Sequence, residues 1–522
     1  MLFLREIRLS RISFVCWSVI LFSSLGQGEV SVAFASQKDN EGVPKYEVRS
    51  INNVNERVVL PKNVINGSNT LTQQMLNSAN TYYVIQSDYV LNSNITIPSN
   101  CALVFEGGSI TGKGDKAVLT GFNTVLRADP VKIFEGVSFK GTFAAECTYA
   151  EWFFDYKDSK DSYVPITKAI ELARCGIGRV KLLKRKYSIS NTITLYNDLI
   201  LEGVCAGQYQ GYDKTQIVCS KEITGIKLDG KLTNGGKEVY VAAITIKDVE
   251  ISGKNRKGSG VSYYSADSRY TWGCNGITME NVSISGFEYG FSLDGAGKSG
   301  SLLNTFQKCI FSGCKIGVYV NRSLYNNSFI FNRCLIRHND WGGVLFQKST
   351  TQTLKFVDCS IEVNGKCSSY KFDKSYGLFG VRIDTDTDPV LFDNCYFEGN
   401  INNDYLADCA DIMANSITVR NCLFSSSSHI VSLKGLGQKE SNIHIEDCVI
   451  YDYNNKVSSK ESFIELGNTK MSNVIFLHNR WKSNGLVYTH RDKILNYNNA
   501  NVNSLSYEGQ FVPNKPEMIL KK

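Results

Sequence analysis

A short hydrophobic pattern recurs through the middle of the chain. Two apolar residues flank a polar one, two bend residues follow, and then come Cys or Val, any residue, and a further apolar residue. The copies place their Val or Cys at Val249, Val282, Cys309, Cys334, Cys359, Cys395, Cys422 and Cys448. The intervals between these positions are 25 to 27 residues, except for two longer intervals of 33 and 36. A repeat of this length predicts a solenoid, in which each unit buries its apolar face against its neighbours.

Each repeat also contains a segment that begins with glycine and alternates apolar and polar residues. Its copies are Gly290–Leu293, Gly317–Val320, Gly343–Phe346 and Gly380–Ile383. With the two apolar arms of the first pattern, this segment gives three short strands per coil. We therefore predict an all-β fold, a right-handed parallel β-helix of about 26 residues per coil, with coils about 4.8 Å apart. A leucine-rich repeat has a similar length, but its leucine-dense pattern and helical return are absent.

The two-residue bend of the first pattern usually ends in Asp or Asn. The residues concerned are Asp248, Asn281, Asp358, Asn394, Asn421 and Asp447. Such side chains tolerate bend geometry and bond to neighbouring backbone groups, so we expect stacked copies to satisfy one another's amides.

The cysteines of the pattern are predicted to form an inward ladder of small buried hydrophobes. Parallel side chains give poor disulfide geometry along such a ladder. Bridges stay open for Cys101, Cys147, Cys175, Cys205, Cys219 and Cys274. The sequence has neither paired CxxC motifs nor Cys/His clusters with zinc spacing, so no metal ligands are predicted.

The segments on either side of the repeats differ from them in composition. Residues 1–35 contain three arginines, the apolar run Ile12–Leu25 and a small-residue end, which predicts a cleaved signal peptide and an exported protein. The later sequence has no membrane-length apolar run, so the mature protein is expected to be soluble. We assign residues 36–80 to a polar leader, 81–150 to a small β unit, 151–481 to the β-helix and 482–522 to a cap or tail. Residues Tyr163–Arg174, which are followed by Gly176 and Gly178, predict an amphipathic helix that caps the solenoid.

The net charge of +7 falls to +6 when residues 1–35, with three Arg and two Glu, are removed. This mild charge is compatible with an acidic polymer as partner but is ordinary for a soluble protein. Dense runs of Lys and Arg with interleaved aromatic residues are missing, which argues against nucleic acid as a partner. The sequence gives no indication of the oligomeric state.

The chain resembles the pectate-lyase-like superfamily of secreted and phage-tailspike β-helix proteins over roughly residues 150–481. The resemblance rests on Glu151-Trp152-Phe153 before the capping helix and on the Asn/Asp-Cys coils, together with the segments Val180–Leu182, Tyr187–Ile189 and Leu199–Gly203. The segment Phe105–Ile110 is similar to the leader of such proteins in gut Bacteroidetes. Leu183 and Arg185 depart from the Pro and Gly that are usual in the first strand pair. One such scaffold hosts lyases, hydrolases, epimerases and plain binders, so the resemblance implies a fold and, more loosely, a polysaccharide as ligand.

The resemblance implies that chemistry occurs on the face formed by the glycine-initiated strand and the loop leading into it. Two rows of outward side chains are predicted to line one groove there. The first row is Arg337, Glu362 and Glu398, with His338 and Asp340 nearby. The second row is Asp294, Asn321, Gln347 and Asp384, followed by Asp386 and Asp388. An insertion between Lys366 and Tyr376 could overhang the groove, with Trp341, Tyr370 and Tyr376 as candidates for stacking on sugars.

These residues allow two kinds of glycan cleavage. Glu362 and Glu398, one coil spacing apart, could act as the acid and the nucleophile or base of a glycoside hydrolase. In a lyase, Arg337, or Asp384 through a bound cation, would neutralise a uronate carboxylate while His338 or a lysine removes the adjacent proton. No cofactor is required by either reaction, although Ca²⁺ could assist a lyase. The Asn-Thr-Asp signature of polygalacturonases has no match at Glu288-Tyr289, Lys315-Ile316 or Trp341-Gly342, which disfavours that family.

Two further interpretations stay open at this point. The row of Arg337, Glu362 and Glu398 could be a solvated ion-pair ladder that contributes little to stability. The whole protein could also be a non-catalytic, glycan-binding protein of the cell surface. The leading hypothesis is an exported polysaccharide lyase or glycoside hydrolase.

Overall fold

The structure, a computed structural model, describes most of the chain from residue 56 to residue 501. The segments it leaves undescribed within that range are 155–159, 208–213, 231–240, 265–272, 297–299, 324–325, 366–378, 388, 401–407, 415, 426–430, 434–440, 452–461, 467–470, 483–485, 489–493 and 498–499. The chain divides into two compact units, Met1–Asn53 and Val54–Lys522, and every described residue belongs to the second. The predicted signal peptide lies outside the described residues. Among the residues that are described, no helix has the length and apolar character needed to span a membrane.

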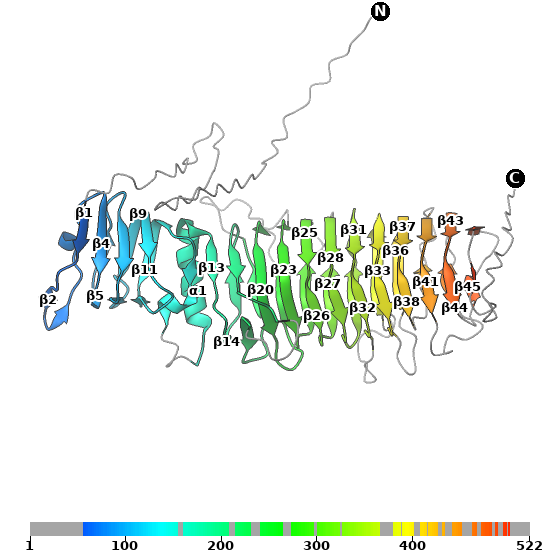
Figure 1. The fold of residues 1–522 in the computed structure, drawn as a ribbon, viewed down its shortest axis with the longest axis horizontal. Coiled ribbons are helices and arrows are strands. Elements are labelled where there is room, and N and C mark those ends of the chain that lie inside the picture. Colours follow the sequence, from blue (N-terminus) through cyan, green and yellow to red (C-terminus); the bar gives the residue numbers. More distant parts are fainter. Residues whose placement is uncertain are drawn as a thin grey trace, which may run out of the picture. The chain divides into compact units, whose positions relative to one another are not determined.

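The predicted parallel β-helix is confirmed, with strands of successive coils stacked side by side (Figure 1). One long sheet contains the first and second strands of each coil, and a second sheet contains the third strands. The first strands are β25 (Leu302–Gln307), β28 (Asn327–Asn332), β31 (Leu354–Val357), β34 (Val390–Asp393), β37 (Ser416–Arg420), β40 (Ser441–Glu446) and β43 (Met471–Leu477). The second strands are β26 (Ile310–Ser312), β29 (Leu335–Arg337), β32 (Ser360–Glu362), β35 (Tyr396–Glu398), β38 (Leu423–Ser425), β41 (Val449–Tyr451) and β44 (Arg480–Lys482). In β20 (Thr245–Ser252) and β23 (Thr278–Ser285) the first and second strands run together.

The third strands form a continuous parallel ladder of their own. They include β21 (Ser259–Tyr264), β24 (Tyr289–Asp294), β27 (Ile316–Asn321), β30 (Gly342–Gln347), β33 (Phe379–Thr387), β36 (Asp408–Ala414), β39 (Val431–Leu433), β42 (Ser462–Leu466) and β45 (Leu486–Tyr488). Earlier coils use β13 (Arg179–Lys181), β14 (Lys186–Ile189), β15 (Ile193–Leu195), β16 (Ile200–Glu202), β17 (Gln216–Cys219) and β18 (Ile226–Leu228). All the pairings between these coils are parallel.

The core is a column of apolar side chains in which each coil stacks on the next. Phe306, Phe331, Phe356 and Phe392 lie on successive coils, with ring centroids 4.7, 4.8 and 4.9 Å apart and nearly parallel planes. These separations match the predicted coil spacing of about 4.8 Å. The ladder cysteines are buried beside this column, as predicted. Their thiols donate to backbone carbonyls, for example from Cys334 to Phe306 at 3.3 Å, and none of the described cysteines forms a disulfide.

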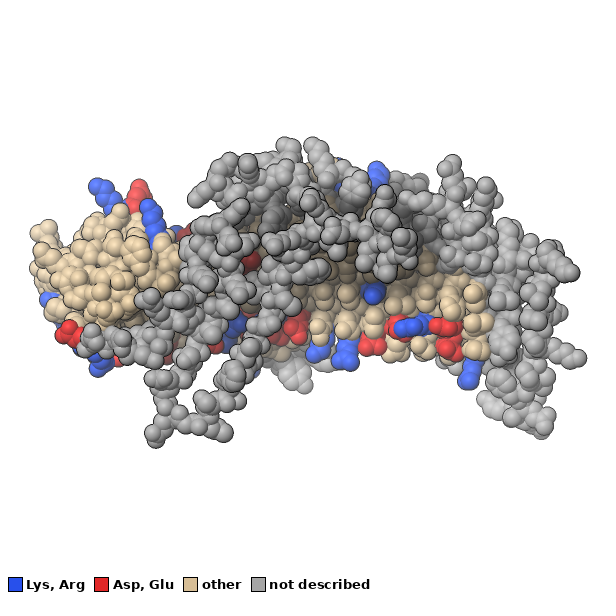
Figure 2. Space-filling view, turned by 90° about the horizontal axis from the view of Figure 1, so that it is seen from above, with Lys and Arg blue, Asp and Glu red and all other residues tan. Residues whose placement is uncertain are grey.

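The bend between the first and second strands has a left-handed backbone residue in each coil from β20 to β44. The six predicted Asp and Asn residues all have φ between 50° and 56°, a region that Asn and Asp tolerate better than most residues. Lys308, Arg333 and His478 occupy the same place with φ of 53°, 54° and 51°, which the sequence pattern did not reveal. The Asx side chains bond to one another rather than to backbone amides, as between Asn281 and Asp248 at 2.7 Å. The charged side chains seen in Figure 2 are of both signs and lie interspersed along the coils.

The bend between the second and third strands contains a buried asparagine ladder. Asn339, Asn364 and Asn400 are at most 1% exposed. The side-chain carbonyl of Asn364 accepts from the amide group of Asn339 at 2.9 Å, and that of Asn400 accepts from Asn364 at 3.1 Å. Each amide also donates to the carbonyl of an inward strand residue, as from Asn364 to Ile336 at 2.9 Å. This ladder fixes the path of the backbone where the third strand begins.

Glycine begins the third strand because no side chain fits there. A Cβ on Gly317 would lie 2.6 Å from the carbonyl oxygen of Gly343 and 3.0 Å from the amide nitrogen of Asn339. Gly290 and Gly343 meet the next coil in the same way, at 2.4 and 2.5 Å. The glycines therefore face the interior and stack in a column beside the asparagine ladder.

The N-terminal part is a separate sheet with its own apolar core. The sheet is parallel and contains β1 (Glu56–Val59), β4 (Thr81–Ile85), β7 (Ala102–Phe105), β9 (Val118–Arg127) and β11 (Ser138–Ala144). Smaller strands here are β2 (Val64–Ile65), β3 (Ser68–Asn69), β5 (Tyr89–Leu91), β6 (Ile95–Thr96), β8 (Ile110–Gly112) and β10 (Phe134–Glu135). Leu60, Leu71 and Leu76 are buried in the core. Residues 56–80 therefore belong to this β unit and not to the predicted polar leader, because their few apolar residues anchor it.

The predicted capping helix is α1 (Tyr163–Leu172), which follows β12 (Thr148–Tyr149) and the 3-10 turn η2 (Ala150–Phe153). It buries Ile166, Ala169 and Ile170 in the solenoid core. Its continuation η3 (Ala173–Ile177) ends where Gly176 and Gly178 have φ of 114° and 74°. The glycines thus stop the helix, as predicted.

At the other end the solenoid continues past the predicted boundary at residue 481. Strands β46 (Ile494–Tyr497) and β47 (Ala500–Asn501) pair with β43 and β44, and β45 extends the sheet of third strands. Strands β45, β46 and β47 therefore add to the coils, so this segment is not only a cap or tail. The apolar pattern is too sparse in this Asn-rich segment to reveal these strands.

Candidate functional site

The first predicted row is a real alignment of side chains on three consecutive coils. Arg337, Glu362 and Glu398 are register partners at the ends of β29, β32 and β35. The residue before each of them is buried in the core, so the row itself points outward. We call these three residues the carboxylate row. Neighbouring members are one coil spacing apart, about 4.8 Å.

A tyrosine and a serine that the sequence pattern did not single out accompany the carboxylate row. Tyr396 precedes Glu398 by two residues on the same face of β35 and pairs with Ser360. Burial raises the pKa of Tyr396 to about 12, helped by a hydrogen bond with Glu398 and by the charges of Glu398 and Glu362. The hydroxyl of Ser360 donates to Glu362. The sequence could have revealed them, because residues two apart on a strand share a face: Tyr396 with Glu398, and Ser360 with Glu362.

An ion-pair ladder along the carboxylate row would need a contact between Arg337 and Glu362. Arg337 and Glu362, both described, are register partners but form no ion pair with each other. Both are partly exposed.

The backbone after each member of the carboxylate row is left-handed. His338, Val363 and Gly399 have φ of 54°, 54° and 57°. Val363 is a β-branched residue in a conformation that suits glycine. The buried asparagine ladder follows one residue later in each coil, so the row is held at a rigid corner.

The second predicted row is also in register, at the ends of β24, β27 and β30 and within β33. Asp294 is held by Arg322 through two hydrogen bonds of 3.1 and 2.6 Å, and Asn321 donates to it at 3.3 Å. Gln347 accepts from the hydroxyl of Tyr319 at 3.1 Å. Three of the four positions are therefore tied into contacts within the sheet. For Asp384 and Asp386 only the strand is described, and Asp388 lies outside the described residues.

The two rows lie at opposite ends of the third strand. Arg337 precedes the bend into β30, and Gln347 ends that strand. Five steps of about 3.3 Å make the strand about 17 Å long. The rows therefore cannot act on the same bond, although one extended chain could touch both. The prediction of a single compact groove is too simple, because periodicity fixes the register between coils but not the distance around a coil.

An aromatic cluster lies between the two rows on the outer face of the third strands. Tyr289 and Tyr319 stack with centroids 4.6 Å apart, and Trp341 packs nearby on the buried residues Ile316, Leu345 and Phe379. Lys315 approaches the Trp341 ring to 4.8 Å. We call Tyr289, Tyr319 and Trp341 the aromatic platform. Trp341 was predicted for sugar stacking, whereas the two tyrosines were missed because their partner is in the next coil.

Some predicted site residues cannot be placed. Tyr370, Tyr376 and the insertion between Lys366 and Tyr376 lie outside the described residues. His338 is described and exposed at the bend after the carboxylate row, and Asp340 pairs with Arg256 from an earlier coil. Within the described segments, no group of three or more His, Cys, Asp or Glu side chains is arranged to hold a metal ion.

The family described as right handed beta helix region matches residues 214–379 and 270–435, which together are less than half of the chain. This match agrees with the right-handed parallel β-helix fold that the coil register shows. The predicted resemblance is confirmed at that level. A search of curated proteins finds no match.

Several solved structures are similar in fold. ORF18 of Geobacillus virus E2 matches with 16% identity and a TM-score of 0.46, over 65% of this chain and 61% of that one. The tailspike gp49 of Acinetobacter baumannii bacteriophage Fri1, a capsular polysaccharide depolymerase, matches with 15% identity and a TM-score of 0.45, over 72% and 65%. The A-module of the Azotobacter vinelandii mannuronan C-5 epimerase AlgE4 matches with 15% identity and a TM-score of 0.40, over 66% and 92%. The chain thus spans less than two thirds of ORF18 and of the tailspike.

Proposed function

We propose that this chain is an exported protein that cleaves an extended polysaccharide at the carboxylate row. The observation that supports the proposal is the outward alignment of Arg337, Glu362 and Glu398 on three consecutive coils. Such a row gives a glycan a line of charged and hydrogen-bonding groups along the solenoid. Export is inferred from residues 1–35 of the sequence.

Hydrolysis is the reaction that this row fits best. Retaining glycosidases hold two carboxyl groups about 5–5.5 Å apart, one as acid and one as nucleophile. Glu362 and Glu398 are one coil spacing apart, about 4.8 Å. Tyr396 and Ser360, which bond to these carboxylates, would orient them toward the glycosidic bond.

A lyase is the second candidate, and Arg337 favours it. A guanidinium beside the scissile unit would neutralise a uronate carboxylate and so acidify the adjacent proton. Tyr396 or His338 would then take that proton, the glycosidic C–O bond would break as the double bond forms, and the leaving oxygen would receive a proton. In this reaction Ca²⁺ could assist Arg337 in neutralising the uronate.

The aromatic platform supports a non-catalytic alternative. Tyr289, Tyr319 and Trp341 offer rings on which sugar faces can pack, whether or not a bond is broken. A glycan-binding protein of the cell surface would need this platform and not the carboxylate row.

The test is an assay of the purified protein on a panel of neutral and uronate polysaccharides. Reducing ends are measured for hydrolysis, and absorbance near 235 nm is measured for the unsaturated ends that a lyase makes. We expect Glu362→Gln and Glu398→Gln each to lower activity by about 100-fold or more, because a positioned acid or base contributes about 10²–10⁴-fold. Arg337→Ala should abolish lyase activity while sparing hydrolysis of neutral chains.

Glu280→Gln is the matched control, because Glu280 is an outward carboxylate of β23 away from the row. Activity that persists in both glutamate variants would exclude the proposed site. Binding without cleavage on the whole panel, lost in Tyr319→Ala, would favour the non-catalytic alternative.

A further inference from the structure

A second candidate site lies in the N-terminal β unit, away from the carboxylate row. A cavity of about 380 Å³ opens between the ends of β7, β9 and β11 and the turn η2. Known small-molecule pockets measure about 300–1,000 Å³. This cavity is therefore large enough for a ligand of one or two sugar rings.

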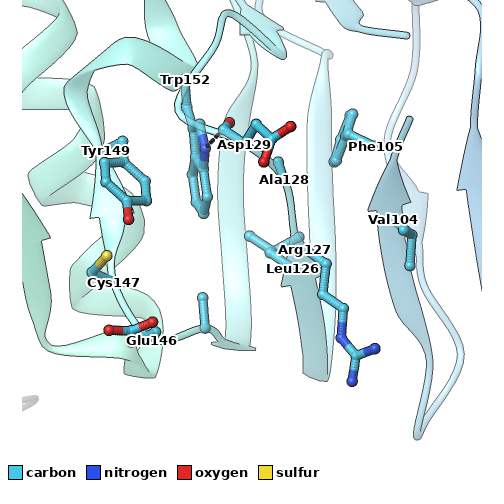
Figure 3. A pocket seen from close by; sticks show the side chains of 11 residues that line it. Val104, Phe105, Leu126, Arg127, Ala128, Asp129, Glu146, Cys147, Tyr149 and Trp152 are labelled. Atoms are coloured by element: carbon cyan, nitrogen blue, oxygen red, sulfur yellow. Dashed lines mark hydrogen bonds between the residues drawn. The ribbon is translucent and has the colours of Figure 1, made fainter. Parts of the chain in front are cut away.

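The apolar wall of the cavity is rigid. Trp152 donates its indole N–H to the backbone carbonyl of Asp129 at 3.0 Å, and it packs edge to face against Tyr149 at 5.6 Å between ring centroids. Phe105 is buried and stacks edge to face on Phe134. In Figure 3 the side chains of Trp152, Tyr149 and Phe105 border the same space. These rings are held before any ligand arrives.

The rim carries charges that the protein itself does not pair. Arg127, Asp129 and Glu146 line the cavity and are exposed. Their side chains form neither ion pairs nor hydrogen bonds with other described residues; the guanidinium of Arg127 instead lies 5.4 Å from the Tyr82 ring centroid. In Figure 3, Asp129 lies at the top of the space, and Arg127 and Glu146 lie at the bottom. Hydrogen-bonding groups are thus available on opposite sides of the cavity.

We propose that this cavity binds a single neutral sugar unit, either free or at the end of a glycan. Sugar hydroxyls both donate and accept, so they can bond to a carboxylate or to the guanidinium of the rim. The apolar face of the ring packs on the aromatic wall. Asp129 and Glu146 against Arg127 give the rim a net charge of −1, which disfavours a uronate.

The state of Tyr149 agrees with this chemistry. Burial raises the pKa of its phenol, and the hydroxyl, which shares a hydrogen bond with Cys147, lies on the wall of the cavity. The proposal does not depend on cleavage at the carboxylate row, since the two sites share no residue.

The test is calorimetric titration of the full chain with D-glucose, D-galactose, D-mannose, N-acetyl-D-glucosamine and D-glucuronate. At least one neutral sugar should bind, and D-glucuronate should bind at least about tenfold more weakly. Arg127→Ala and Asp129→Ala should each weaken binding by about tenfold or more, as expected for the loss of a charge-assisted hydrogen bond. Both residues are exposed, so these variants should fold, which circular dichroism would verify.

Asp115→Ala removes an exposed carboxylate of the same unit outside the cavity and should leave sugar binding unchanged. The variant Glu362→Gln should also bind the sugar normally, which separates this site from the carboxylate row. The proposal is overturned if none of the neutral sugars binds, if D-glucuronate is preferred, or if Arg127→Ala and Asp129→Ala bind as the unmodified chain does.

Discussion

Val363 adopts a backbone conformation that costs energy, directly beside the carboxylate row. Its φ is 54°, and the equivalent bend is occupied by Gly399 in the next coil and by Gly313 two coils before. The left-handed conformation costs a residue with a Cβ roughly 1–2 kcal/mol. Strain of this kind often lies at functional sites, where the surrounding structure holds it in place.

Replacing Val363 with glycine should therefore stabilise the protein. We expect the free energy of unfolding of Val363→Gly to exceed that of Val363→Ala by about 1 kcal/mol, so that Val363→Gly unfolds at a higher temperature. Alanine keeps the cost of the left-handed backbone conformation, whereas glycine does not. Thermal unfolding of both variants measures the difference. Val357→Gly, at an ordinary position of β31, should destabilise instead. An alanine variant as stable as the glycine variant would contradict this account of the strain.

Glu151 is a buried carboxyl at the junction between η2 and the first coils. It is 5% exposed and accepts from the hydroxyl of Tyr187 at 2.7 Å, with Arg185 at 3.5 Å. Burial is the main cause that raises its pKa, against the lowering effects of Tyr187 and Arg185. The folded state consequently holds this proton more tightly than the unfolded state does.

The sign of the pH dependence follows from this difference. The stabilisation from Glu151 is fully present below the unfolded pKa, about 4.3, and is lost as the pH rises through the higher folded pKa. Glu151→Gln removes the titration, so its melting temperature relative to the unmodified protein should increase from about pH 4 to pH 7. Glu135→Gln, an exposed carboxyl, should show no such trend. A relative melting temperature of Glu151→Gln that falls over this range would refute the assignment.

The asparagine ladder is the element that holds the bend beneath the carboxylate row. Asn364 accepts from Asn339 and donates to Asn400 and to the carbonyl of Ile336. Removing its side chain takes away the acceptor of the Asn339 backbone N–H and side-chain amide and the donor to the Ile336 carbonyl, and each lost buried hydrogen bond costs about 1–3 kcal/mol.

Asn364→Ala should accordingly destabilise the protein by about 3 kcal/mol or more. Asn332→Ala, on the outward face of β28, should cost far less because no buried amide depends on it. Urea unfolding of the two variants compares them. Equal stability would show that the ladder contributes nothing beyond filling space.

The elements of the solenoid were predictable because the sequence repeats its apolar positions with the period of the coils. The strands, the left-handed Asx bends and the alignment of Glu362 with Glu398 all follow from that period. The asparagine ladder was not predictable in the same way, because Asn339, Asn364 and Asn400 look like ordinary bend residues in one dimension. Their burial results from stacking, which no single coil reveals.

At the scale of the whole molecule, the coils are interchangeable units. Phe329 and Leu354 are register partners, so residues 329–353 make up one coil. Without these residues, Ser328 would be followed directly by Leu354, which occupies the same place in its coil as Phe329 does. Each coil contacts chiefly its neighbours, so the shortened chain can stack in the same register.

We expect the chain without residues 329–353 to fold, with a lower stability and an unchanged circular dichroism spectrum per residue. Removal of residues 334–353 alone leaves a fragment of a coil and should prevent folding of the part that follows. Limited proteolysis distinguishes the two. A chain that tolerates both deletions equally would contradict the stacked register.

At this scale the sequence did not reveal how far apart two outward residues of the same coil lie around the solenoid. Arg337 and Gln347 both point outward and were predicted to share a groove, yet a whole strand separates them. The N-terminal cavity was also invisible, because Arg127, Asp129 and Glu146 come from segments without a repeat.

The column of glycines that begins the third strands restricts where this protein can change. Gly290, Gly317 and Gly343 touch the backbone of the following coil, so any side chain there would push two coils apart. The outward residues on either side of the column carry no such restriction. Exposed residues on these faces can therefore be exchanged while the column of glycines between them is inherited intact.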